Sequence, residues 1–169
     1  MATRSTLVTG FFKNRTAAEA AFDVLLKRGY PREEISLLMS DETRTKTFGL
    51  ASGTHAAEGA TAGGVLGGTV GGVLAAVAAV GTNLALPGLG LVIAGPIAAA
   101  LAGIGAGTVT GGLVGALVGA GIPEHRAKVY ESGIRSGGIL IGVGARSDQE
   151  ADEIERVLEE VGAEHVRQK

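Results

Sequence analysis

The sequence predicts a mixed α/β fold, and three observations predict it. Charged residues are frequent up to Glu58, absent from residues 59–123, and frequent again from Glu124. The two charged zones each alternate short β-rich runs with amphipathic helical runs. The two zones also resemble each other at a fixed offset along the chain. We therefore expect one small α/β domain that is interrupted by an uncharged insert.

The offset between the two zones specifies the fold further. A shift of 133 positions places Asn14 on Ser147 and Gly29 on Gly162. Both pairs stand where a helix would begin and end. Two β-α-β halves with a weak internal repeat predict a ferredoxin-like split βαβ sandwich, interrupted here by a glycine-rich helical hairpin.

Residues 1–49 are predicted to form the first half of this domain. Residues 6–12 are a β-rich run, and Asn14 stands where a side chain can cap the start of a helix. Apolar residues recur at helical spacing up to Gly29, which favours a helix end, and residues 35–39 read as the next strand.

The second half spans residues 123–169 and repeats this plan. Pro123 suits the first turn of a helix, and Ser147 followed by Glu150 is a capping box. The many carboxylates after Ser147 read as a solvated helix face. The predicted elements are, in order, a helix over 123–133, a strand over 138–143, a helix from Ser147 to Gly162 and a strand over 164–167.

The insert, residues 50–122, contains most of the 29 glycines of the chain, and in each arm a series of them recurs every four residues. Such small-xxx-small ridges let a neighbouring helix backbone approach closely. Each glycine inside a helix costs up to about 1 kcal/mol relative to alanine, so these helices need surroundings that bury them. The predicted helix-packing and oligomer-interface residues are Gly59, Gly63, Gly67 and Gly71 in the first arm and Gly103, Gly107, Gly111, Gly115 and Gly119 in the second.

The length of each arm suits a bilayer. Residues 58–83 and 95–121 are each roughly as long as the ~20 residues that cross a hydrocarbon core. Residues 83–90 break the helix, and Pro96 can open the next one. Both ends of such a hairpin would lie on the cytoplasmic side of the membrane. The scarcity of Leu and Ile in the arms and the lack of Trp or Tyr at an interface weaken the membrane prediction. The alternative is a soluble homo-oligomer in which hairpins from several subunits pack together and exclude water.

Catalytic and ligand-binding patterns were sought without result, so no catalytic residue, metal or cofactor is expected. The chain has no cysteine, and its glycine-rich stretch contains no Lys or Arg to meet a phosphate. His55, His125 and His165 lie far apart without metal-ligand spacing. His125 could approach Glu124 or Glu131, which would be a solvated surface pair. A net charge of −2 argues against nucleic acid as a partner.

Several segments resemble bacterial general stress proteins of the heat-induced type. They are the helix end at residues 25–30, the strand at 35–38, the Gly/Ala-rich insert, and the return segments at 121–124, 130–134 and 137–141. The similarity covers nearly the whole chain. It implies a bacterial, membrane-associated or self-assembling protein linked to stress, and it brings no active site with it.

Together these observations predict a non-enzymatic homo-oligomer whose partners are further copies of itself and membrane lipid. The N-terminus lacks the apolar region of a secretory signal, so we expect an unprocessed chain at the cytoplasmic membrane. The alternative is a soluble cytoplasmic shell, ring or filament. A third possibility is a small-ligand sensor that uses the sheet face, which rests on fold analogy alone.

Overall fold

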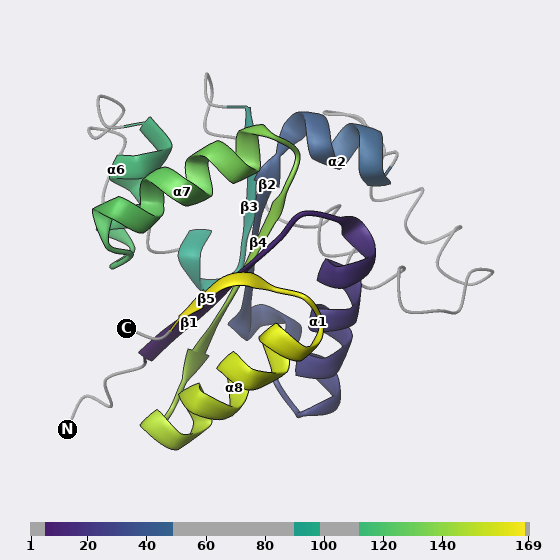
Figure 1. The fold of residues 1–169 in the computed structure, drawn as a ribbon, viewed down its shortest axis with the longest axis vertical. Coiled ribbons are helices and arrows are strands. Elements are labelled where there is room, and N and C mark those ends of the chain that lie inside the picture. Colours follow the sequence, from purple (N-terminus) through teal and green to yellow (C-terminus); the bar gives the residue numbers. More distant parts are fainter. Residues whose placement is uncertain (1–5, 49–89, 99–111, 168–169) are drawn as a thin grey trace.

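The computed structural model describes residues 6–48, 90–98 and 112–167, and these form one antiparallel sheet with helices on both faces (Figure 1). The strand order is β3-β2-β4-β1-β5. The strands are β1 (Thr6–Phe12), β2 (Ile35–Ser40), β3 (Leu91–Ala94), β4 (Ile139–Ala145) and β5 (Glu164–Arg167). The helices are α1 (Arg15–Lys27), η1 (Arg32–Glu34), α2 (Asp41–Phe48), α6 (Gly112–Gly119), α7 (Glu124–Arg135) and α8 (Asp148–Glu160).

The connections interleave the two halves of the chain. β4 from the second half lies between β1 and β2, and β1 lies between β4 and β5. The β1–β4 register is continuous, from Thr6 opposite Ala145 to Phe12 opposite Ile139. Neither half therefore holds a sheet by itself, because each one supplies the central strand of the other.

One face of the sheet is covered by α1 and α8, the helices that the internal repeat predicted (Figure 1). Asn14 caps α1 by accepting from the N–H of Ala17, and Ser147 caps α8 by accepting from the N–H of Glu150. Both helices end at a glycine with positive φ, 91° at Gly29 and 92° at Gly162. These predicted caps and stops are confirmed.

The other face is covered by α6 and α7, which pack against each other (Figure 1). Their core includes Leu113 and Leu117 from α6 and Tyr130 and Ile134 from α7. Because both faces are covered, strands such as β2 are buried at nearly every position and show no alternation of buried and exposed residues. The helix predicted over residues 123–133 is confirmed as α7.

The described parts of the predicted insert join this core. Leu91–Ala94 form β3, which pairs with β2 and was not predicted as a strand. Residues 96–98 are helical, as the proline at position 96 predicts, and the N–H of Ile97 bonds to Ser36 Oγ at 3.1 Å. The rest of the predicted hairpin lies outside the described residues.

The short helix α2 was also not predicted. It begins after Ser40, whose Oγ accepts from the N–H of Thr43, and Asp41 and Glu42 stand in its first turn. Carboxylates there interact favourably with the positive end of the helix dipole. The helix has no apolar stripe, which is the signal that periodicity would have needed.

Candidate functional site

Two of the nine predicted interface glycines lie in the described residues, and both are on α6. Gly115 is half-buried and Gly119 is exposed. The other seven, Gly59, Gly63, Gly67, Gly71, Gly103, Gly107 and Gly111, lie outside those residues. The structure therefore informs the end of the second arm only.

α6 has one buried and one open side. Leu113 and Leu117 point into the core and are at most 1% exposed, while Val118 is 42% exposed. Among the described residues, no atom lies within 4 Å of the Cβ that a side chain at Gly115 would have. The helix, GLVGALVG, carries no charged side chain. Its open side is consequently an uncharged surface of glycine and valine.

The end of α6 is fixed by backbone hydrogen bonds. Gly121 adopts a φ of 93°, and its N–H donates to the carbonyl of Val118. The N–H of Ile122 donates to the carbonyl of Leu117. Pro123 then leads into α7. This Schellman ending holds α6 against α7 and keeps its open side turned outward. Within the described ranges, no helix has the length and apolar character needed to cross a bilayer.

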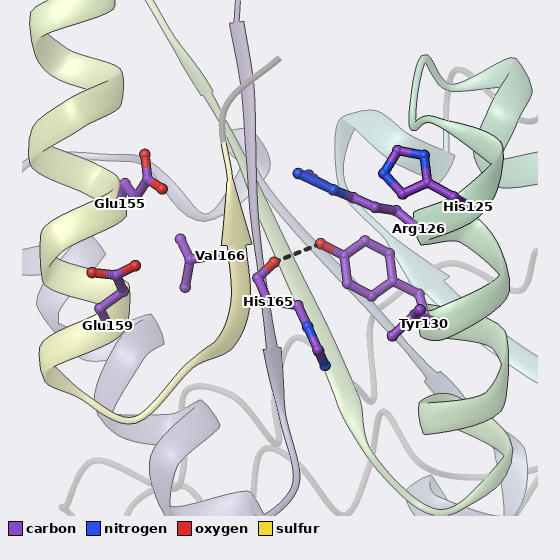
Figure 2. Close-up of a pocket in the computed structure, with 8 residues that line it drawn as sticks. His125, Arg126, Tyr130, Glu155, Glu159, His165 and Val166 are labelled. Atoms are coloured by element: carbon purple, nitrogen blue, oxygen red, sulfur yellow. Dashed lines mark hydrogen bonds between the residues drawn. The ribbon is translucent and has the colours of Figure 1, made fainter.

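A second feature is a groove of about 740 Å³ along the free edge of β5 (Figure 2). α7 forms one wall and α8 the other, with β5 between them. The groove is lined by His125, Arg126, Val129, Tyr130, Glu155, Glu159, His165 and Val166. Most of these side chains are polar or charged, so the groove is mainly polar. Val129, which is 44% exposed, provides one apolar patch.

A buried tyrosine connects the wall of the groove to the sheet. Tyr130 Oη lies 2.9 Å from Thr9 Oγ1 and 3.0 Å from the carbonyl oxygen of His165, the bond drawn in Figure 2. A carbonyl only accepts, so the single phenol proton goes to His165 and the Thr9 hydroxyl donates to Tyr130. The ring also stacks near that of Phe11, with centroids 6.4 Å apart. The hydroxyl is thus fully engaged and structural.

The groove brings together two histidines that the sequence keeps 40 positions apart, His125 and His165. His55 lies outside the described residues. Glu124 and Glu131, the sequence-suggested neighbours of His125, pair instead with Lys128 and Arg135 at 2.7 and 2.9 Å. In the part of the chain that the structure describes, no three His, Cys, Asp or Glu side chains meet in a way that could hold a metal ion.

A polar cluster at the other end of α8 joins the two halves. Tyr30 donates to Glu150 Oε1, and the backbone N–H of Arg146 donates to Glu150 Oε2. Arg146 also pairs with Glu34 at 3.2 Å. Burial raises the pKa of Tyr30 above its usual range, whereas the Tyr30 hydrogen bond and then that from Arg146 lower the pKa of Glu150. Glu150 thus belongs to the capping box of α8 and also connects the two halves of the chain.

The sequence analysis treats His125 and His165 as separate residues and predicts neither the groove that both line nor the role of Tyr130. Tyr130 lies at helical spacing with Ala127 and Ile134, which marks it as a core residue of α7, yet nothing in the sequence indicates its partners. Thr9 and His165 come from opposite ends of the chain. Only the sheet order places them together.

The fold defines a mixed α/β protein with a five-stranded antiparallel sheet covered on both faces. Comparison with protein-family models, with curated proteins and with solved structures found no match. The resemblance to general stress proteins stays an expectation from the sequence.

Proposed function

We propose that this chain is a non-enzymatic, self-assembling protein, built on a ferredoxin-like scaffold, whose copies associate through the open side of α6 and the glycine-rich insert that α6 ends. The observation that carries the proposal is the uncharged surface around Gly115 and Val118. The strand order β2-β4-β1-β5 supports the ferredoxin-like scaffold, with β3 added at one edge. The resemblance to general stress proteins supports a stress-linked context.

The physical argument starts from the cost of leaving α6 uncovered. A helix with no charged residue on any side is normally buried all round. Leu113 and Leu117 bury one side against the sheet, and the side with Gly115 and Val118 faces outward. Since Gly115 presents no side chain, the backbone of a second helix could approach it closely and gain van der Waals contacts.

A second copy fits this surface better than lipid does. α6 has eight residues and is about 12 Å long, against the ~30 Å of a hydrocarbon core. It is also fixed to a charged α/β domain through Ile122 and α7. We keep association with a membrane as the alternative, because the longer predicted arms lie outside the described residues.

The substitution Gly115→Leu tests the proposal. Among the described residues, a Cβ at Gly115 meets no atom within 4 Å, and leucine raises helix propensity by up to about 1 kcal/mol relative to glycine. We expect an unchanged or raised melting temperature together with a smaller sedimenting species. Val118→Lys should reduce the assembly in the same way, since it places a charge in the interface.

The matched control is Val129→Lys, which adds the same charge at the other strongly exposed valine. It should leave the mass of the assembly unchanged. Sedimentation is measured with and without detergent, and flotation with vesicles separates protein from lipid as the partner. A wild-type chain that is monomeric without detergent, or one whose mass survives both α6 substitutions, overturns the proposal; flotation that depends on α6 favours lipid.

A further inference from the structure

The edge strand β5 departs from regular pairing with its neighbour β1. Thr9 pairs with Arg167 and Phe11 pairs with Glu164, so His165 and Val166 together oppose the single residue between Thr9 and Phe11. His165 has φ 54°, a left-handed conformation that few residues other than glycine adopt. This is a β-bulge, which interrupts the hydrogen-bond ladder and increases local twist.

The bulge is held by a buried hydrogen-bond chain. Thr9 is a buried residue, with 3% of its surface exposed. Its hydroxyl donates to Tyr130, and Tyr130 donates to the carbonyl of His165. That bond uses one of the two lone pairs of the carbonyl and directs it towards Tyr130 on α7, away from the position that an incoming strand would need. Breaking the chain would leave buried polar atoms without partners, which costs about 1–3 kcal/mol each.

The walls of the groove add an electrostatic obstacle to a second copy. Antiparallel pairing of two β5 strands about an axis perpendicular to the sheet would place both α8 helices on the same face. Glu155 and Glu159 of one copy would then approach the same residues of the other. Like charges at that position repel.

From these observations we propose that the bulge at His165, fixed by Tyr130 and Thr9, closes the β5 edge to strand addition. Natural proteins protect edge strands by bulges and charges because an open edge pairs with any other strand. The inference refines the proposed function: copies are kept from extending the sheet through β5, and assembly is directed to α6.

The test compares one variant that removes the bulge and one that removes its hydrogen bond from Tyr130 with a control that keeps both. Between the pairs Thr9–Arg167 and Phe11–Glu164, deletion of His165 leaves one residue on each strand. Tyr130→Phe removes the hydrogen bond to the His165 carbonyl without changing the length of the chain. His165→Gly is the control, because glycine accepts the positive φ. All are made in the Gly115→Leu background, so that association through α6 is suppressed.

Association through β5 is read from a spin label at a cysteine introduced by Glu160→Cys. The chain has no other cysteine, and position 160 on α8 is exposed and outside the groove. We expect a dipolar signal between α8 helices in the two bulge variants, with dimerisation at least about tenfold tighter than in the parent. The parent and His165→Gly should give none.

Far-UV circular dichroism and thermal unfolding show which variants are folded. If the deletion variant does not fold, Tyr130→Phe decides. A dipolar signal of equal strength in the parent, or its absence from every folded bulge variant, overturns the inference. Failure of the α6 proposal looks different: the Gly115→Leu parent keeps its full assembly mass, while the α8 label still reports on β5.

Discussion

Gly95 is a residue whose conformation and surroundings both require glycine. Its φ is 80°, and a Cβ there would lie 2.4 Å from the carbonyl oxygen of Ile35 and 2.7 Å from the Cα of Ser36. Gly29 also has positive φ, 91°, but an added Cβ meets nothing within 4 Å among the described residues. The two positions therefore separate backbone strain from steric overlap.

We expect Gly29→Ala to lower the free energy of unfolding by about 1–2 kcal/mol, the cost of the left-handed conformation. Gly95→Ala should cost about 2–5 kcal/mol, since the overlap with backbone atoms of β2 adds to it. Urea-induced unfolding of both variants measures the difference. Equal losses would mean that the backbone of β2 moves aside at no cost.

Glu150 gives the stability a defined dependence on pH. Its pKa is lowered in the folded protein, first by the hydrogen bond from Tyr30 and then by that from the N–H of Arg146. A lowered folded pKa contributes stability above the unfolded value, about 4.3, and this contribution is lost as the pH falls through the folded value. The link between the halves is thus weakened by acid.

The substitution Glu150→Gln removes this ionisation. At about pH 7 we expect it to lower the free energy of unfolding by about 0.5–1 kcal/mol, a value discounted for the partial exposure of the group. The difference from wild type should shrink as the pH falls through the lowered pKa of Glu150 in the folded protein, because wild-type Glu150 then becomes protonated as well. A difference that is constant over this range would show that Tyr30 and Arg146 do not act through the charge.

At the scale of elements, the sequence predicts α1, α7, α8 and the strands β1, β2, β4 and β5 because each has local signals. Asn14 and Ser147 are caps, and Gly29 and Gly162 are stops, and all depend on neighbouring backbone atoms only. β3 carries no such signal. Its four apolar residues follow a glycine-rich run and become a strand because the edge of β2 is there to pair with.

The candidate site was predictable in part for the same reason. The glycine spacing marks Gly115 as a helix-packing residue, and among the described residues no atom lies within 4 Å of a Cβ added there; its place in an interface stays a prediction. It did not indicate that Leu113 and Leu117 fix the opposite side to the domain. The bulge at His165 was not predictable, since a residue other than glycine takes the positive φ and its partners Thr9 and Tyr130 are remote in the sequence.

α6 should therefore be a structural part of the domain. We expect Leu117→Ala to lower the free energy of unfolding by about 2–5 kcal/mol, because it leaves a cavity between α6 and the sheet. Val118→Ala, one position on and 42% exposed, should change it by no more than about 0.5 kcal/mol. Denaturant titration under conditions that dissociate the assembly distinguishes them. Similar small effects for both would show that α6 does not belong to the cooperative core.

At the scale of the whole molecule, the chain returns twice to one sheet from within its uncharged middle. The first return is β3, and the second is α6 with the Schellman ending that leads into α7. β3 extends the sheet, and α6 packs with α7 over the sheet face that carries residues such as Leu38 and Leu140. The boundaries at residues 50 and 122 were predicted from the loss and return of charged residues along the sequence. In the structure they cut through a single hydrophobic core.

Two loop replacements test this integration. In the first, a Gly/Ser linker replaces residues 50–88; in the second, the same linker replaces residues 50–121, as the charge boundary suggests. The N–H of Asp41 bonds to the carbonyl of Gly90 at 2.7 Å, and α2 adds eight residues, or about 12 Å, beyond it. A flexible linker of about eight residues has a mean span of about 15 Å, which is sufficient.

The first variant should fold cooperatively, because it retains β3, Ile97 and α6. The second removes Leu91, Ile93, Leu113 and Leu117 from the core and uncovers Tyr130 on α7. Each fully buried side chain of this kind contributes about 1.5–3 kcal/mol, and their sum is comparable with the about 5–15 kcal/mol by which a domain is stable. Thermal unfolding should therefore show a transition for the first variant and none for the second. A cooperative transition in the second variant would mean that residues 91–98 and 112–121 cover a sheet which is already stable without them.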